Sequence, residues 1–318
     1  MGAGGARPPG GTGMERERAS GVLYAVAAYG TWGLLPAYWK LLGALPATEI
    51  LAHRVLWTAL FTALLLTVLG RWGEFRSALS DRRERLALLA SGGLIAFNWL
   101  VFIAAVNRGE ILAASFGYYL NPLINVLLAV TLLGERLARP QAIGVAIAAL
   151  GVAALGLELG GLPWVALTLA FSFAGYGLLH KVGRVRPIPA LAVETALLAP
   201  FALLALGWLG GGALRQGTEP ERALLVGAGV VTALPLIWFA AAARRLRFST
   251  LGLFQYLAPT LSFALAIAVY GEPFSRAQAF AFVCIWVALA ICSAHGLRHA
   301  SRLRAVAATA TTAAAPRA

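Results

Sequence analysis

Ten apolar runs, each close to 20 residues long, occupy most of the chain between residues 21 and 295. A helix of roughly 20 mostly apolar residues can cross the hydrocarbon core of a bilayer. The chain is 60% hydrophobic and only 12% charged, and one globular core cannot enclose that many apolar side chains. The runs therefore predict an all-α integral membrane protein with ten transmembrane helices. They are Gly21–Leu42, Thr48–Leu69, Leu86–Asn107, Ile111–Leu133, Pro140–Leu157, Leu162–His180, Ile188–Leu209, Ala223–Ala243, Ser249–Gly271 and Ala277–His295.

The basic residues are concentrated on alternate connections between these runs. Of the 26 Lys and Arg residues, 20 lie on the side that includes both termini, five lie on the other side, and Arg54 lies inside a run. Cytoplasmic connections are enriched in Lys and Arg, so this asymmetry predicts an even number of crossings with both termini in the cytoplasm. The net charge of +13 is then a signature of insertion in the lipid bilayer, and we predict no nucleic-acid partner.

The two ends of the chain differ in composition from the runs. Residues 1–20 are rich in Gly and Pro, and residues 297–318 are rich in Ala and Thr. Both are predicted to be disordered cytoplasmic tails. Five runs fall in residues 21–157 and five in residues 162–296, which predicts two five-helix repeats.

A motif of the fourth run recurs in the ninth run at a constant offset of 137 residues. Tyr119–Pro122 is followed by Gly134-Glu135, and Tyr256–Pro259 is followed by Gly271-Glu272. Because each repeat has an odd number of helices, the second repeat must enter the membrane from the opposite side. Secondary transporters are commonly built from such inverted repeats, with the substrate site near the midplane between them.

Polar side chains share one face of the two runs that carry this motif. Tyr118, Asn121 and Asn125 have the i, i+3, i+7 spacing of one helix face. A proline inside a helix frees a backbone carbonyl that must face protein or water, so we predict a cavity lining beside two helix hinges. Hydrogen bonding between packed helices is the alternative. The predicted cavity residues are Trp32, Asn98, Tyr118, Asn121, Asn125, Gln255 and Ser262, and the hinges are Pro122 and Pro259.

Ionisable residues lie inside two of the apolar runs. Glu49, His53 and Arg54 are in the second run, and Glu194 is in the seventh. Such residues are costly in a membrane and usually serve a function. We predict that His53 or Arg54 contacts an anionic group of a substrate, and that Glu49 or Glu194 carries a coupling proton. The alternatives are that Arg54 extends to the headgroups, that Glu49 lies at the interface and that Glu194 forms a structural pair.

Residue patterns typical of enzymes are missing from the sequence. Asp81 is the single aspartate, and neither Lys40 nor Lys181 follows a nucleotide-binding glycine motif. The four histidines lack zinc-protease spacing. We therefore predict that the chain is not an enzyme and has no cofactor, no metal site and no required partner subunit; a homo-oligomer stays open.

Several motifs carry a resemblance to a known family. They are Ala52–Arg54, Asn98-Trp99, Ala114–Leu123, Gly134–Leu137, Thr250–Gly252 and Tyr256–Thr260. In order and spacing they resemble the RarD-type members of the EamA family, within the drug/metabolite transporter superfamily. The resemblance spans about residues 21–296. Phe116 and Tyr119 stand where relatives often carry Leu and Phe, which are conservative differences.

The resemblance implies a secondary transporter of the bacterial inner membrane with ten helices in two EamA repeats. Related transporters move amino acids and other metabolites, often outward. We accordingly predict alternating-access export of a small metabolite or drug-like solute, without taking the family label of chloramphenicol sensitivity as the substrate. A non-transporting membrane scaffold or sensor, and a channel, are the alternatives.

Overall fold

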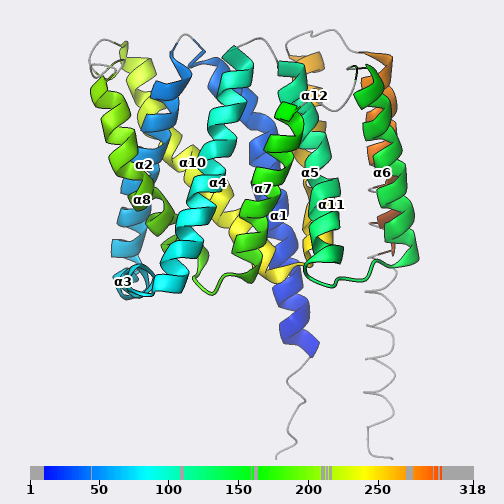
Figure 1. The fold of residues 1–318 in the computed structure, drawn as a ribbon, viewed down its shortest axis with the longest axis horizontal. Helices are drawn as coiled ribbons and strands as arrows, with labels where there is room; N and C mark the ends of the chain where they lie inside the picture. The colour runs from blue at the N-terminus through cyan, green and yellow to red at the C-terminus, as the bar shows by residue number, and fades with distance from the viewer. Residues whose placement is uncertain are drawn as a thin grey trace, which may run out of the picture. The chain divides into compact units, whose positions relative to one another are not determined.

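The computed structural model describes residues 11–43, 45–107, 111–158, 160, 164–208, 212, 214, 217–269, 275–288, 290–292 and 294–295, and the regular secondary structure of these residues is entirely α-helical (Figure 1). Helices satisfy every backbone N–H and C=O within one segment, which an apolar medium requires. The helices are α1 Gly11–Lys40, α2 Ala47–Val68, α3 Trp72–Ser80, α4 Arg82–Asn107, α5 Ile111–Thr131, α6 Arg139–Glu158, α7 Trp164–Val182, α8 Pro187–Trp208, α10 Glu219–Arg245, α11 Phe248–Phe254 and α12 Leu257–Ala268. Residues 276–288 are also helical.

Six stretches of the described residues are long and apolar enough to cross a membrane. They are Thr48–Val68, Arg82–Phe102, Arg139–Glu158, Trp164–Val182, Pro187–Trp208 and Glu219–Arg245. The predicted all-helical membrane class is confirmed. The count of ten transmembrane helices stays a prediction.

The first helix begins earlier than expected. The prediction that residues 1–20 are a disordered tail is wrong for residues 11–20, because α1 begins at Gly11. The segment Glu15–Ala19 consists of Glu, Arg and Ala, which are strong helix formers. Extending an existing helix through such residues costs little compared with starting a new one. The remaining tail predictions fall on residues 1–10 and 297–318, outside the described residues.

The ninth apolar run forms two helices and not one. Helix α11 ends at Phe254, α12 begins at Leu257, and a turn lies between them. Pro259 has no N–H to give to the carbonyl of Gln255, four residues earlier, and its ring crowds that carbonyl. Pro122, in contrast, lies inside the uninterrupted helix α5.

The described helices belong to two compact units. The first comprises residues 1–134 and 162–272, and the second comprises residues 135–161 and 273–318. In the second unit, α6 packs closely on the helix of residues 276–288: a Cβ added at Gly151 would lie 2.8 Å from the Cβ of Cys284. These units describe packing, and the division into two sequence repeats stays a prediction.

In the first unit, helices from one half of the sequence pack mainly against helices from the other half. The main pairs are α2 with α8, α5 with α7, α1 with α10, α2 with α10, α4 with α7, α1 with α12 and α5 with α11. The weaker pair of α4 with α8 corresponds to α2 with α10. Let α1, α2, α4 and α5 of the first half correspond in order to α7, α8, α10 and α11–α12 of the second half. Replacing each helix by its counterpart then turns every one of these packing pairs into a pair of the same set. Two repeats related by a twofold axis produce this pattern.

An aromatic cluster fills the core of the first unit where α1, α7 and α10 meet. The Trp32 ring lies 5.5 Å from Phe173 and 5.7 Å from Phe239, measured between ring centroids. Tyr29 and Tyr176 also contact Phe239, at 6.1 Å and 5.9 Å. Aromatic pairs at these distances are stabilising beyond their burial, so the cluster joins helices of both halves.

Candidate functional site

The guanidinium group of Arg54 lies between two tryptophan rings. Its Cζ is 4.5 Å from the ring centroid of Trp39 on α1 and 4.3 Å from that of Trp99 on α4. The Nε atom donates a hydrogen bond of 3.1 Å to Thr232 Oγ1 on α10. No carboxylate of the described residues lies within salt-bridge distance of Arg54. Four helices thus position a cation that has no anionic partner in the described part of the chain.

The two ring contacts explain how Arg54 is tolerated. Each cation–π contact is worth about 0.5–2 kcal/mol, and an arginine at the centre of a membrane helix costs about 2.5–3.5 kcal/mol. The stabilisation from two such contacts is therefore comparable with the free-energy cost of placing the arginine in the membrane. Besides Nε, the guanidinium carries terminal N–H groups in its own plane, and such groups can donate to an anion.

Asn121 is a buried amide without a hydrogen-bond partner. It lies on α5, is 1% exposed, and neither its Nδ2 nor its Oδ1 has a partner among the described residues. Leaving a buried polar atom unsatisfied costs about 1–3 kcal/mol, so such a group requires an explanation such as a ligand or water. Tyr118, three residues earlier on the same helix face, is close enough to Arg54 for an electrostatic interaction.

Asn125 has a hydrogen-bond partner for its Nδ2, unlike Asn121, although its Oδ1 has none among the described residues. Its Nδ2 donates a hydrogen bond of 2.8 Å to Gln255 Oε1, and this bond joins α5 to the turn between α11 and α12. At this crossing a Cβ added at Gly252 would lie 3.1 Å from the carbonyl oxygen of Pro122. The two sequence motifs offset by 137 residues therefore meet in space, and part of their polar face serves helix packing.

Three other predicted cavity residues also make packing contacts. Asn98 Nδ2 donates to the carbonyl oxygen of Leu169 and to Ser172 Oγ, both at 2.9 Å, which joins α4 to α7. Ser262 Oγ on α12 donates to the carbonyl oxygen of Gly33 on α1 at 2.9 Å. Trp32 lies in the aromatic cluster. These contacts favour the alternative of interhelical hydrogen bonding and packing at these positions.

Glu49 and His53 form a buried ionisable pair on α2. His53 Nε2 is 3.9 Å from Glu49 Oε1, and the two side chains are 3% and 4% exposed. The Glu49 carboxylate also lies against Gly212, where an added Cβ would collide with it. His53 Nε2 has no hydrogen-bond partner among the described residues.

Glu194 lies in a buried cluster where α4, α7 and α8 meet. Its Oε1 accepts a hydrogen bond from Ser91 Oγ of α4 and is 2.9 Å from His180 Nε2 of α7. Its Oε2 has no partner among the described residues, and the residue is 1% exposed. This geometry is compatible with both predictions for Glu194, namely that it carries a proton and that it forms a structural pair.

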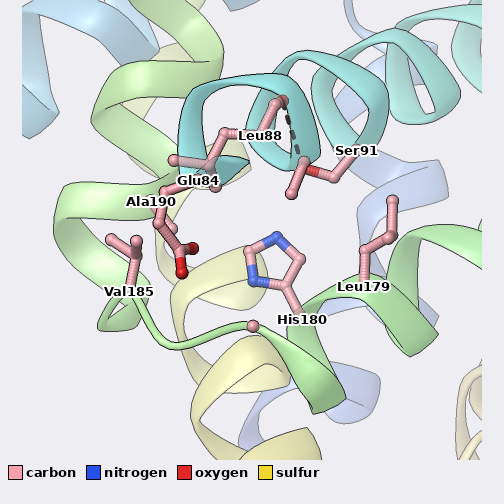
Figure 2. A pocket seen from close by; sticks show the side chains of 9 residues that line it. Glu84, Leu88, Ser91, Leu179, His180, Val185 and Ala190 are labelled. Carbon is pink, nitrogen blue, oxygen red and sulfur yellow. Dashed lines mark hydrogen bonds between the residues drawn. The ribbon is translucent and has the colours of Figure 1, made fainter. Parts of the chain in front are cut away.

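A small cavity adjoins this cluster. Its volume is about 20 Å³, which is enough for one water molecule. Figure 2 shows the side chains of Glu84, Ser91 and His180 among those that surround it. Glu84 and Gly183 on the rim are partly exposed, so the cavity reaches towards the end of the first unit where α3 lies (Figure 1).

Several functional candidates were missed by the sequence reasoning. Thr232 and Trp39 gave no signal, because their importance depends on which side chains they contact across helices. His180 did have a sequence signal, because it ends the sixth apolar run and Glu194 lies near the start of the seventh. The short connection between those runs places both residues at the same side of the membrane.

Comparisons with known proteins agree with this architecture. A model of the EamA-like transporter family matches residues 19–157 and again residues 161–294. An uncharacterized transporter of Pseudomonas aeruginosa is 46% identical over 286 residues, which are 89% of this chain and 96% of that protein. Protein RarD of Escherichia coli is 43% identical over 279 residues, or 87% and 94% of the two chains. One crystal structure with 20% identity covers 88% of this chain and 98% of its own, with a TM-score of 0.70, which shows a shared fold.

Proposed function

This chain belongs to the EamA-like transporter family, and we propose that it is a secondary active transporter that exports a small solute bearing an anionic group. The family, and the Pseudomonas aeruginosa relative named as a transporter, make it a multi-pass membrane transporter. We further propose that it lies in the bacterial inner membrane, as its similarity to bacterial transporters suggests, and that both termini are cytoplasmic, which the distribution of its basic residues supports.

The observation that carries this proposal is the aromatic clamp on Arg54, formed by Trp39 and Trp99. An arginine within the membrane normally pairs with a carboxylate or a backbone carbonyl. Here the rings and Thr232 hold the cation in a fixed orientation, and its terminal N–H groups match a carboxylate or phosphate with two parallel hydrogen bonds. A planar fork held in place loses little entropy when an anion binds.

Asn121 supplies the second element of the proposed site. Its unsatisfied amide can both donate to and accept from a polar solute. Tyr118 lies on the same face of α5 and interacts electrostatically with Arg54, which connects the amide to the clamp. A solute with an anionic group and a neutral polar group fits this combination.

The arrangement also suits alternating access. Trp39, Arg54 and Trp99 come from the first half of the sequence, and Thr232 comes from the second. In transporters built from two repeats, one part rocks against the other around a central site. Relative movement of α2 and α10 would change the Arg54–Thr232 contact and with it the orientation of the guanidinium.

The test is a comparison of exported metabolites between a deletion strain and strains that overproduce wild-type protein or Arg54→Gln. We expect solutes enriched in the medium by the wild-type protein to carry a carboxylate or phosphate. Loss of a charge-assisted contact of about 1.5–3 kcal/mol predicts that Arg54→Gln lowers their enrichment by about tenfold or more.

The matched control is Arg245→Gln. Arg245 also stacks on an aromatic ring, with its Cζ 5.2 Å from the centroid of Tyr24, but it lies in the last turn of α10 and not in the clamp. We expect this variant to export like the wild type. Equal enrichment by wild type and Arg54→Gln would overturn the site, and no solute enriched by the wild type would overturn the transport proposal.

A further inference from the structure

The cluster of Ser91, His180 and Glu194 has chemistry that the proposed solute site does not use. It is a carboxylate and an imidazole in direct contact, both more than nine-tenths buried, with one carboxylate oxygen unpartnered among the described residues. We propose that this cluster is the proton-binding site of the transporter and that it exchanges its proton with water at the end of the first unit where α3 lies. The proposal rests on the proposed function only for the step in which the proton drives solute movement.

The contact between His180 and Glu194 is suited to hold one proton. With one proton bound, the pair is electrically neutral overall, and we place that proton on the Glu194 carboxyl, because a neutral imidazole beside a carboxylic acid avoids two buried charges. Release of that proton to water leaves a neutral imidazole and a buried carboxylate, so the pair gains a net negative charge. A buried charge is costly in low dielectric, and the protonation state therefore has a large influence on which arrangement of α4, α7 and α8 is stable.

The surroundings include few other titratable groups. On α7, the helix of His180, the Tyr176 ring lies tilted at 59° to the His180 ring, with 4.5 Å between ring centroids, and Tyr176 interacts electrostatically with Glu194. From α4, Glu84 lines the same cavity. From α10, Arg244 interacts electrostatically with Glu84. Lys181 follows His180 but donates to the carbonyl oxygen of Leu246.

The small cavity provides the route for the proton. It borders His180 and Ser91 and has room for one water, while Glu84 on its rim is partly exposed. A carboxylate at the mouth and one ordered water suffice to pass a proton to the imidazole by hydrogen bonds. The buried carboxylate is thus connected to the surface on one side.

Helix α4 links this cluster to the solute site. Ser91 contacts Glu194, and Trp99, eight residues later on α4, contacts Arg54; eight residues correspond to about 12 Å of helix rise. At Gly92, α4 packs against Glu194 of α8, since an added Cβ would lie 3.4 Å from the Cβ of Glu194, an ordinary van der Waals contact. A shift of α4 when the proton leaves would therefore move one ring of the clamp.

Infrared difference spectroscopy of the purified full chain in lipid nanodiscs tests the proton site without a known solute. We expect one buried carboxylic acid whose C=O band disappears as the pH is raised. The band should be lost in Glu194→Gln and retained in Glu49→Gln, which alters the other buried glutamate beside a histidine. Ser91→Ala should shift the frequency of the band, because it removes one hydrogen bond to the same carboxyl.

The route is tested by the exchange of this band in D₂O. Ala87 lines the cavity and is partly exposed, so Ala87→Phe fills the cavity with little disturbance to the core and should slow the exchange several-fold. Ala90→Phe, on the exposed face of the same helix, is the control and should leave the rate unchanged. Equal exchange rates in the two variants would overturn the route.

The outcomes separate this proposal from the proposed function. A pH-dependent band that persists in folded Glu194→Gln, or the absence of any such band in the wild type, overturns the proton site even if solutes are exported. A band with the expected behaviour in a protein that exports nothing supports the proton site and overturns transport. If both hold, enrichment of exported solute should depend on the pH of the medium in wild type and in Glu219→Gln, an exposed change, and should lose that dependence in Glu194→Gln.

Discussion

Two asparagines one turn apart on α5 show how a residue's role depends on its neighbours. Asn125 donates to Gln255, whereas Asn121 has two buried polar atoms without partners in the described part of the chain. The sequence spacing places both on one helix face and treats them alike. Only the position of the α11–α12 turn makes one a packing residue and leaves the amide of the other without a partner among the described residues.

Glu74, at the surface on α3, allows a prediction about pH. Arg71 donates two hydrogen bonds to its carboxylate, at 2.7 Å and 2.8 Å, and Arg186 lies 3.6 Å away. The hydrogen bonds with Arg71 lower the pKa of Glu74 below its ordinary value. The contribution of ionised Glu74 to the free energy of unfolding is therefore present at neutral pH, and it is lost as the pH falls through the pKa of Glu74 in the folded protein.

Glu74→Gln should accordingly destabilise the protein at pH 7 by less than about 1 kcal/mol, since exposed ion pairs are weak. The difference from wild type should disappear at low pH. Thermal unfolding of both proteins in detergent, followed between pH 7 and the acid range, measures this. A difference that grows as the pH falls would contradict the assigned pairing.

At the scale of elements, two prolines in corresponding motifs have different effects. Pro122 leaves α5 continuous, while Pro259 follows a break between α11 and α12. Both remove one backbone hydrogen bond. The break lies at Gln255, whose side chain accepts the hydrogen bond from Asn125, so the turn also presents the side chain that connects the two motifs.

Pro259→Ala should partly join α11 and α12, because residue 259 would gain an N–H that can donate to the carbonyl of Gln255. We expect slower hydrogen exchange of the backbone amides next to the turn, and weaker solute export. Pro122→Ala is the matched control and should change exchange in α5 only slightly. Unchanged exchange at residues 255–257 in Pro259→Ala would show that packing, and not the proline, holds the turn.

At the scale of the molecule, the first unit is held together by close contacts between the halves of the sequence. A Cβ added at Gly229 of α10 would lie only 2.4 Å from the backbone carbon of Trp57 on α2. Small residues allow such close helix approach in membranes. Nearby, Thr58 Oγ1 donates to the carbonyl oxygen of Gly229 at 3.3 Å. The α2–α10 crossing therefore tolerates no side chain at this position.

Gly229→Ala should lower stability by about 1–3 kcal/mol, the usual cost of overpacking, because the added methyl meets backbone that cannot rotate away. Gly93→Ala on α4 is the control: its added Cβ has nothing within 4 Å, and alanine is favoured over glycine inside a helix by roughly 0.5–1 kcal/mol. Thermal unfolding in nanodiscs compares the two. Equal stability of both variants would contradict the tight crossing.

Much of the fold could be predicted from local patterns. Apolar runs of membrane length predicted an all-helical membrane protein, and the motifs around Pro122 and Pro259 identified two segments that do meet. The errors concern competition between local preferences: strong helix formers extended α1 to Gly11, and Pro259 divided a run that hydropathy alone makes continuous.

Sequence patterns single out residues of the candidate site but not the partners of those residues. Arg54 and Glu194 stand out because charge inside an apolar run is costly. Hydropathy contains no information about Trp39, Trp99 and Thr232 as the partners of Arg54, since these residues come from three other helices. Whether Asn98 lines a cavity or joins two helices likewise depends on the rotation of α4 against α7.

The sequence by itself determined that the chain lies in a bilayer, that it is helical and that it belongs to its family, because these follow from the sum of many side-chain transfer energies and from short motifs. The tertiary structure alone decided which charges are paired: it placed Arg54 between aromatic rings without an anion among the described residues and Glu194 against His180 and Ser91. The physical reason is that pairing depends on helix rotation and crossing at the scale of a few ångströms. Those quantities are set by the packing of small and large residues across helices that lie far apart in the chain.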